Sequence, residues 1–474
     1  MESSNKNILI KFQNPELPIV CVQGLGFVGA AMSLAVADAS DTNGDPLFNV
    51  IGVDLPTPDG KARIDALNAG SFPFETVDNK LLEVFENINR RGNLIATSEV
   101  ETFSRASIVL VDVHLDIDTE NAAPRIAIQG FKSAIEILGQ EITSGVLVII
   151  ETTVPPGTCE NIVAPLLCDC LKSRGMSEND FLLAHSYERV MPGVDYYDSI
   201  INFWRVYSGL TDEAADACGD FLSKIINTKD YPLTRLKSTR ASETAKLLEN
   251  SYRATNIAFI EEWGRFAEAI GIDLFEVIEA IRVRPTHNNI RQPGFGVGGY
   301  CLTKDPLFAS LAAKSILNLD GVQFPFCTQA VRINQRMPLV SLDKVEKMLD
   351  GSLQGRTILL LGVSYRPDVG DTRYSPSQTF VENAYARGAE VICHDPLVRH
   401  WPEMDMNIPQ NIPEPVGIDA VVFASSHEHY RNIDLKQWFQ GEQPCVLDAN
   451  NVLTESQRTF LKQSGYKFDS IGRG

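Results

Sequence analysis

Positive charge is scarce in this chain. The 474 residues include 42 Lys and Arg against 61 Asp and Glu, which gives a formal net charge of −19. This deficit argues against nucleic acid and against an anionic membrane as partners, because both require a cationic surface. No stretch approaches the ~18 apolar residues of a membrane-spanning helix, and residues 1–4 show no basic region followed by an apolar one. We therefore expect a cytoplasmic protein.

Metal-binding and disulfide patterns are also missing. The nine cysteines are scattered and odd in number, and the spacing of Cys168 and Cys170 is too short for a CxxC pair. The seven histidines form no HExxH or repeated HxH arrangement. We expect most of the cysteines to be buried reduced thiols, and we expect no metal site.

The N-terminal part of the chain has the pattern of a dinucleotide-binding fold. An apolar run at 17–23 leads into a GxGxxG turn, which a helix-compatible segment follows. Three more apolar runs alternate with helical segments, at 48–53, 108–113 and 146–150. This alternation is typical of a doubly wound parallel sheet. The sequence therefore predicts an α/β fold that opens with a Rossmann domain over residues 1–210.

The glycine turn and a later acidic residue predict the cofactor. In such a turn Gly24 permits the bend, Gly26 admits a pyrophosphate and Gly29 lets the helix pack on the strand. The pyrophosphate then lies at the helix N-terminus, on free backbone N–H groups. Asp54 follows the second strand, where a carboxylate accepts hydrogen bonds from ribose and repels a 2′-phosphate, so NAD is favoured over NADP. The predicted cofactor-binding residues here are Gly24, Gly26, Phe27, Val28, Gly29 and Asp54.

The rest of the chain changes character twice. Long helical stretches at 239–270 and 274–283 predict a central helical domain over 211–325, which provides either a dimer surface or internal packing. A second α/β pattern predicts a domain over 326–474. Its first strand leads into a turn without GxGxxG, so we expect a ligand other than a dinucleotide there.

Two further features indicate catalysis. Cys301 follows a glycine-rich run, which describes either a tight loop that presents its thiol or a flexible surface turn beside a packed cysteine. Lys246 and Asn250 lie four residues apart on one face of the long helix. Together they can hold a developing oxyanion, although a solvated lysine beside an unrelated asparagine gives the same pattern.

Six motifs occur in a fixed order along nearly the whole chain. They are Gly24-Leu-Gly-Phe-Val-Gly29, Glu151-Thr-Thr-Val-Pro-Pro-Gly-Thr158, Glu188-Arg-Val-Met-Pro-Gly193, Lys246-Leu-Leu-Glu-Asn250, Gly298-Gly-Tyr-Cys-Leu-Thr-Lys-Asp305, and Gly362 through Gly370-Asp-Thr-Arg373. With these motifs the chain resembles the UDP-glucose/GDP-mannose dehydrogenase family. The resemblance implies an N-terminal NAD-binding domain, a central helical domain that forms a homodimer, and a C-terminal UDP-binding domain.

The resemblance also implies a reaction. Two successive hydride transfers to two NAD would turn the 6-hydroxymethyl of a UDP-sugar into a carboxylate. Lys246 and Asn250 would hold the oxygen of the intermediate aldehyde, and both would contact the substrate. Cys301 would then add to the aldehyde, and oxidation of the adduct would give a thioester that water hydrolyses.

The remaining roles rest on the resemblance alone. It implies that Thr153 and Asp305 position or polarise the water, and that Glu188 acts as an acid/base and contacts the substrate. Arg373 would approach the cofactor, as would Thr153. The other implied substrate-binding residues are Arg189, Gly298, Lys304 and Arg366, and Arg284 and Arg291 are further candidates.

Departures from the family pattern concern the cofactor loop and the sugar. The stretch 111–116 lacks the usual Thr-Pro pair, so either His114 replaces the threonine hydroxyl or the loop is repositioned. Several motifs look more like the branch that acts on UDP-N-acetylhexosamines, particularly UDP-N-acetylmannosamine, although Tyr300, Thr303 and Lys304 depart from it. UDP-glucose oxidation, a two-electron hydroxy-acid dehydrogenase and a non-catalytic NAD-binding protein are the alternatives.

Overall fold

The computed structural model describes residues 12–118, 124–177 and 180–474, so the N-terminal segment 1–4 lies outside the described residues. The chain divides into unit 1, residues 1–248 and 308–322, and unit 2, residues 249–307 and 323–474. Within the described ranges, no helix combines the length and the apolar character that a membrane crossing requires. The three-domain boundaries at 210 and 325 stay a prediction.

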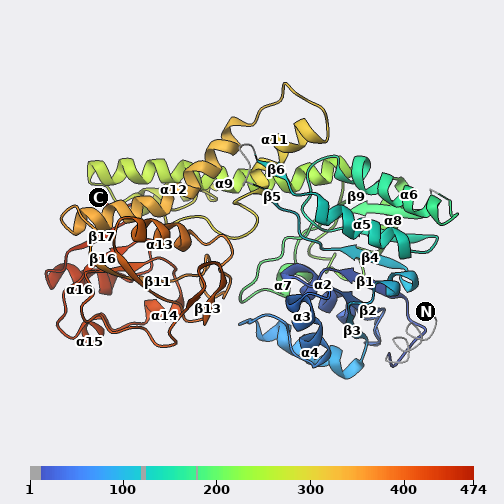
Figure 1. Ribbon diagram of the computed structural model, residues 1–474, viewed down its shortest axis with the longest axis horizontal. Helices are drawn as coiled ribbons and strands as arrows, with labels where there is room; N and C mark the ends of the chain where they lie inside the picture. Colours follow the sequence, from blue (N-terminus) through green and yellow to red (C-terminus); the bar gives the residue numbers. More distant parts are fainter. Residues whose placement is uncertain (1–11, 119–123, 178–179) are drawn as a thin grey trace. The chain divides into compact units, whose positions relative to one another are not determined.

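Unit 1 is built on an eight-stranded sheet. Its strands, in spatial order, are β10 (Thr234–Arg235), β9 (Val206–Gly209), β8 (Phe181–His185), β7 (Val146–Ile150), β4 (Ile108–Val111), β1 (Ile19–Gln23), β2 (Asn49–Val53) and β3 (Leu94–Thr97). Neighbouring strands are parallel except for β8 and β9. The labels β9, β4, β1, β2 and β3 follow one another along this sheet in Figure 1. The predicted α/β fold is confirmed, and the strand order reverses at β1 and β4, where dinucleotides bind in such sheets.

Burial explains why these strands read as continuous apolar runs. Every residue of β1, β2 and β7 is buried, because helices cover both faces of a parallel sheet. Helix α2 (Phe27–Asp38) is apolar nearly all round and is buried from Gly29 to Ala37. It shares one core with α4 (Asn79–Arg91) and α8 (Asp212–Leu222), whereas α5 (Gln129–Glu141) and α6 (Ala164–Ser173) pack against each other.

The long helix α9 (Thr239–Ile270) begins in unit 1 and continues in unit 2. It ends at Gly271, whose φ of +75° favours glycine. Asp273 then caps α10 (Leu274–Arg282) by accepting a 2.9 Å hydrogen bond from the backbone N–H of Phe275. Both helices were predicted from the sequence, and both are confirmed.

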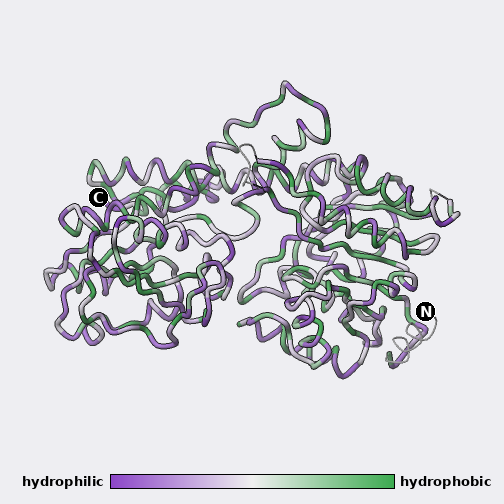
Figure 2. Tube along the Cα trace, viewed as in Figure 1, coloured by the Kyte–Doolittle hydropathy of each residue, from purple (hydrophilic) through white to green (hydrophobic). Residues whose placement is uncertain are grey.

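Unit 2 contains a five-stranded parallel sheet. Its strands, in spatial order, are β12 (Glu390–His394), β11 (Thr357–Leu361), β15 (Ala420–Phe423), β16 (Cys445–Asp448) and β17 (Phe468–Ser470). Helices α12 (Pro325–Met348) and α13 (Pro376–Ala386) cover one face. Helices α14 (Glu428–Arg431), α15 (Leu435–Phe439) and α16 (Glu455–Gln463) supply the core on the other face (Figure 1). Figure 2 shows that hydrophobic residues concentrate in the strands of both sheets.

Candidate active site

The glycine turn of unit 1 leaves room where a dinucleotide would lie. Gly24 has a φ of +96°, and a Cβ there would come within 2.6 Å of the carbonyl oxygen of Asp112. A Cβ on Gly29 would collide with the carbonyl oxygen of Gly24. At Gly26, which caps α2, the Cβ position is open, with no atom within 4 Å. The turn therefore fits a pyrophosphate at the N-terminus of α2, beside Phe27 and Val28.

Asp54 is held in place at the carboxyl end of β2. Its Oδ2 accepts a 3.3 Å hydrogen bond from the backbone N–H of Leu25 and pairs with Arg63 Nε at 2.8 Å. Its Oδ1 accepts a 2.8 Å hydrogen bond from the N–H of Leu55. These contacts orient the carboxylate beside the glycine turn, as a ribose-binding residue requires. Arg63 was not anticipated from the sequence.

Lys246 and Glu188 come together in unit 1. The Nζ of Lys246 donates a 2.6 Å hydrogen bond to the backbone carbonyl of Glu188 and lies 3.7 Å from its carboxylate. The ammonium also lies over the ring of Tyr187, 5.2 Å from its centre, and Arg189 donates to the Tyr187 hydroxyl at 3.2 Å. Lys246 is only 6% exposed, so it is not a solvated lysine. Tyr187 joins this group without a prediction from the sequence.

The loop that carries Thr153 is tied to the start of α9. The carboxylate of Glu243 accepts backbone hydrogen bonds from Gly157 at 2.6 Å and from Cys159 at 2.8 Å. Burial raises the pKa of Glu243 to about 7, and the two backbone donors oppose that rise. Thr153 lies half-buried between β7 and this anchor.

Asn250, Lys304 and Asp305 form a buried polar cluster in unit 2. Asn250 Nδ2 donates a 2.8 Å hydrogen bond to Asp305 Oδ2, and Lys304 Nζ lies 2.8 Å from Asp305 Oδ1. The backbone N–H of Asp305 donates to the carbonyl of Cys301 at 2.9 Å. One short segment therefore ties the thiol-bearing residue to the acid, the amide and the ammonium. Lys304 is 5% exposed and its ammonium is engaged with Asp305, and its contact with substrate stays a prediction.

The glycine run before Cys301 is packed against other parts of unit 2. A Cβ on Gly296 would strike Pro376, and one on Gly298 would strike Tyr365. Gly299 has a φ of +78°, and its Cβ would come within 2.6 Å of the Tyr365 ring. Cys301 itself is half-buried. The loop is thus close-packed, which differs from a flexible surface turn.

The two predicted arginines of the C-terminal part follow the first strand of its sheet. Arg373 makes two hydrogen bonds to Asp371, of 2.9 and 2.7 Å, and interacts electrostatically with Cys301. Arg366 is half-buried in the same loop. Of the other residues singled out from the sequence, Arg291 is half-buried, and Arg284 and His114 are exposed.

A buried network fixes the loop that carries Arg366. Ser364 Oγ donates a 2.8 Å hydrogen bond to Asp395 Oδ2 and lies 2.9 Å from His427 Nε2. The backbone N–H of Asp368 donates to His427 Nδ1 at 2.9 Å. This network was not predicted, because its members come from the ends of three different strands and only the fold joins them.

The sequence analysis also missed a buried cluster of charges in unit 1. Asp112 and Glu151 follow β4 and β7 directly, and Glu151 Oε1 pairs with Arg205 Nη2 at 3.1 Å. Glu151 and Arg205 are 1% and 3% exposed. An acidic residue immediately after an all-apolar strand was the available signal for both carboxylates.

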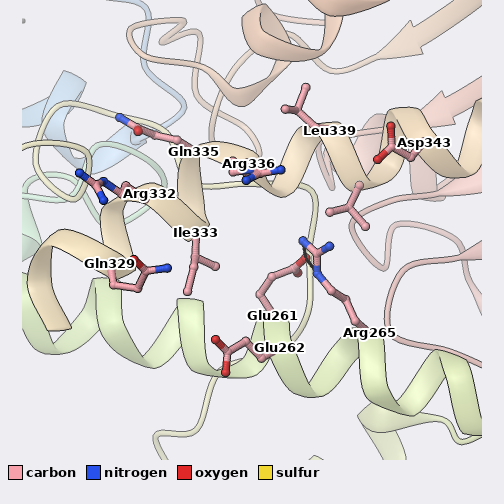
Figure 3. A pocket seen from close by; sticks show the side chains of 11 residues that line it. Glu261, Glu262, Arg265, Gln329, Arg332, Ile333, Gln335, Arg336, Leu339 and Asp343 are labelled. Atoms are coloured by element: carbon pink, nitrogen blue, oxygen red, sulfur yellow. Dashed lines mark hydrogen bonds and ion pairs between the residues drawn. The ribbon is translucent and has the colours of Figure 1, made fainter. Parts of the chain in front are cut away.

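A groove of about 660 Å³ lies elsewhere in unit 2, between α9 and α12 (Figure 3). Charged side chains of both signs line it, among them Glu262 and Arg265 from α9 and Arg332 and Arg336 from α12. None of the predicted site residues lines this groove.

Comparison with known protein families covers most of the chain. Residues 19–226 match the NAD binding domain of the UDP-glucose/GDP-mannose dehydrogenase family. Residues 240–336 match the central domain of that family, and residues 359–455 match its UDP binding domain.

Individual relatives match over 72% of this chain or more. The chain is 29% identical over 461 residues to a UDP-N-acetyl-D-mannosamine dehydrogenase of Methanocaldococcus jannaschii, covering 96% of each protein. It is 25% identical over 347 residues to a UDP-glucose 6-dehydrogenase of Rickettsia conorii, covering 72% of this chain and 76% of that protein. The solved structure of a UDP-D-ManNAc dehydrogenase from Pyrococcus horikoshii aligns with a TM-score of 0.80 at 27% identity, covering 96% of this chain and 99% of that one.

Proposed function

Because the chain belongs to the UDP-glucose/GDP-mannose dehydrogenase family, we propose that it oxidises the C6 hydroxymethyl of a UDP-sugar to a carboxylate in two NAD-dependent steps. The observation that carries this proposal is the segment that joins Cys301 to Asp305, Lys304 and Asn250 in unit 2. A two-electron dehydrogenase needs an oxyanion-binding group but no thiol. Here the segment that carries the thiol also carries Asp305, which accepts a hydrogen bond from the amide of Asn250.

In the first step the alcohol at C6 becomes an aldehyde. NAD, when bound at the glycine turn, accepts the hydride. Lys246 and Asn250 stabilise the developing negative charge on the oxygen, one by its charge and the other by a hydrogen bond. Burial strengthens both effects, because Lys246 is 6% and Asn250 3% exposed.

In the second step the aldehyde is captured and oxidised again. The sulfur of Cys301 adds to the aldehyde carbon, and loss of a second hydride from this adduct leaves a thioester. A thiolate is the attacking form of cysteine, and Arg373 is a cation that interacts electrostatically with this sulfur. Water then hydrolyses the thioester, with Thr153 and Asp305 positioning it and Glu188 acting as acid/base.

For the sugar we propose a UDP-N-acetylhexosamine such as UDP-N-acetylmannosamine. The support is the naming of the relatives from Methanocaldococcus jannaschii and Pyrococcus horikoshii, both matched over nearly their whole length. UDP-glucose is the second candidate, supported by the Rickettsia conorii relative. The product would be an activated uronic acid for surface polysaccharides, made in the cytoplasm, where nucleotide sugars and NAD are available.

A panel of UDP- and GDP-sugars tests this proposal. Purified protein is incubated with each sugar and NAD, and both NADH and sugar acid are quantified. Two NADH for each UDP-N-acetylhexosamine oxidised is the expected result. One NADH per substrate would instead indicate a hydroxy-acid type of dehydrogenase, and cofactor binding without any NADH would indicate a non-catalytic protein.

The altered loop after β4 has its own test. NAD is titrated against wild type and His114→Ala. Weaker binding by the variant would mean that the imidazole replaces the missing threonine hydroxyl. Unchanged binding would mean that the loop is repositioned and that His114 does not contact the cofactor.

We further propose that two copies of the chain associate through the central helices. Five large apolar side chains of α9 are each about half exposed, namely Tyr252, Phe259, Trp263, Phe266 and Ile270. Their spacing places them on one helix face, and an exposed apolar patch of this kind marks an interaction surface. The adjoining groove between α9 and α12 carries charges of both signs, as a self-complementary two-fold contact requires.

A further inference from the structure

The carboxyl groups of Asp112 and Glu151 lie side by side; Glu151 is 1% exposed, and Asp112 is half-buried with its Oδ2 fully buried. Val111 and Ile150 are partners in the parallel register of β4 and β7, so the residues that follow them are neighbours at the carboxyl edge of the sheet. Each carboxyl group acts on the pKa of the other, as close neighbours do. Two carboxyl groups can share a hydrogen bond only if one of them is protonated.

The surroundings decide where that proton resides. Among the described residues, none donates a hydrogen bond to Asp112 Oδ2 or to either carboxylate oxygen of Glu151, but Glu151 has the guanidinium of Arg205 at 3.1 Å. Burial raises the pKa of Asp112 well above its usual range, and the negative charges of Glu151 and Glu188 raise it further. Burial also raises the pKa of Glu151, and Arg205 opposes that rise. The proton therefore belongs on Asp112.

Among the residues that the structure describes, the other titratable groups around the pair supply no second counter-charge. They are Glu188 after β8, His185 in β8, Cys218 in α8 and Lys246 in α9. Burial lowers the pKa of His185 to about 3, so its ring is neutral, and burial raises the pKa of Cys218, so its thiol is protonated. The ammonium of Lys246 is engaged with Glu188. One guanidinium thus faces two carboxyl groups.

The pair lies on the nicotinamide side of the predicted cofactor site. Dinucleotides bind across the point where strand order reverses, here β1 and β4, and Asp54 at the end of β2 marks the side of the adenosine ribose. The ends of β4 and β7 are therefore on the side of the nicotinamide. Asp112 adjoins the glycine turn, since a Cβ built on Gly29 would lie 3.2 Å from the Cβ of Asp112.

We propose that Asp112 and Glu151 hold one shared proton whose loss makes the protein prefer NAD over NADH. The nicotinamide ring is cationic in NAD and neutral in NADH. When both carboxyl groups are ionised, they and Arg205 together carry one negative charge, which attracts the cationic ring of NAD. When only one carboxyl group is ionised, Arg205 balances its charge and the three groups are neutral overall. As pH rises and the shared proton leaves, NADH binding weakens relative to NAD binding. This inference rests on the cofactor part of the proposed function and is independent of the sugar.

Binding measurements without sugar test the proposal. The dissociation constants of NAD and NADH are measured at about pH 6 and about pH 9, and the preference for NAD should grow about tenfold between them. In Asp112→Asn with Glu151→Gln neither member of the pair can ionise, so the preference should not change with pH. Asp220→Asn, which removes an exposed carboxylate of α8 in the same unit, should behave as wild type. A preference in wild type that is independent of pH would overturn the proposal.

A second measurement needs no variant. Calorimetric titration of the wild type in buffers of different ionisation enthalpy gives the number of protons taken up on binding. NADH should bind with more proton uptake than NAD in the range where the pair ionises. Equal proton uptake for the two cofactors would contradict the proposal even if the double variant failed to fold. Failure of the sugar panel with a pH-dependent cofactor preference would refute the proposed sugar and leave this inference standing.

Discussion

Asn250 donates its side-chain hydrogen to Oδ2 of Asp305 over 2.8 Å, inside the core of unit 2. The carboxylate is fully buried, and its other oxygen holds the ammonium of Lys304 at 2.8 Å. A buried carboxylate with both oxygens occupied fixes the orientation of the two groups that bind it. Asp305 therefore positions Asn250 and Lys304 in addition to the role in hydrolysis that we propose for it.

Asp305→Asn should lower both stability and activity. The substitution removes the carboxylate that faces the buried ammonium of Lys304, which costs about 3 kcal/mol. The midpoint of thermal unfolding should fall, and NADH production should be lost.

The double variant Asp305→Asn with Lys304→Met separates the two effects. It removes the buried ammonium together with the carboxylate that faces it, so the unfolding midpoint should recover most of the loss while activity stays absent. Recovery of activity together with stability would show that Asp305 serves only to neutralise Lys304.

Asp54→Ala should reduce the discrimination between NAD and NADP. The variant loses the ribose-binding carboxylate, so NAD affinity should fall about tenfold. It also frees Arg63, now paired with Asp54 at 2.8 Å, to meet a 2′-phosphate. Titration with both cofactors measures the change, and an unaltered NAD to NADP ratio would remove Asp54 from the cofactor site.

Glu243 should make stability fall as pH rises. Its pKa is raised from 4.5 to about 7, so its folded form holds a proton that the unfolded form releases. The protonated carboxyl group of Glu243 contributes to the free energy of unfolding below about pH 4.5. This contribution is lost as pH approaches 7, a change on the order of 3 kcal/mol. Denaturant unfolding at a series of pH values should show this fall in wild type and a smaller one in Glu243→Gln. The exposed control Glu136→Gln should follow wild type, and equal slopes for Glu243→Gln and wild type would contradict the assignment.

Trp263→Glu should dissociate the proposed dimer. Trp263 is about half exposed and lies edge-on to Phe259 and Phe266, so a carboxylate there would be buried in an apolar contact between two copies. Sedimentation velocity should give a monomer for this variant. Ile137→Asp changes an exposed apolar residue of α5 and should leave the dimer intact, and a monomeric wild type would refute the interface.

The sequence was sufficient for features that depend on local pattern. The GxGxxG turn, the apolar strands and the bounds of α9 follow from residue type and spacing along one segment, and the structure contains all of them. The glycine run before Cys301 was also visible, but not what it packs against. Tyr365 lies more than sixty residues away in the sequence, and only the fold brings its ring to Gly299.

Features that join distant segments were out of reach. Ser364, Asp395 and His427 come from three strand ends, and no spacing rule relates them. Glu151 stands in one of the six motifs and Arg205 in none of them, and only the fold brings the two side chains together. The catalytic roles of Cys301, Lys246, Glu188 and Thr153 stay predictions.

The most direct test is the rate at which Cys301→Ser forms sugar acid from a UDP-sugar that the wild type oxidises. A hydroxyl is a much weaker nucleophile than a thiolate, so capture of the aldehyde and turnover of the resulting ester should both fail. We expect sustained acid formation to be abolished while NAD still binds. Acid formation at the full wild-type rate would contradict the covalent mechanism.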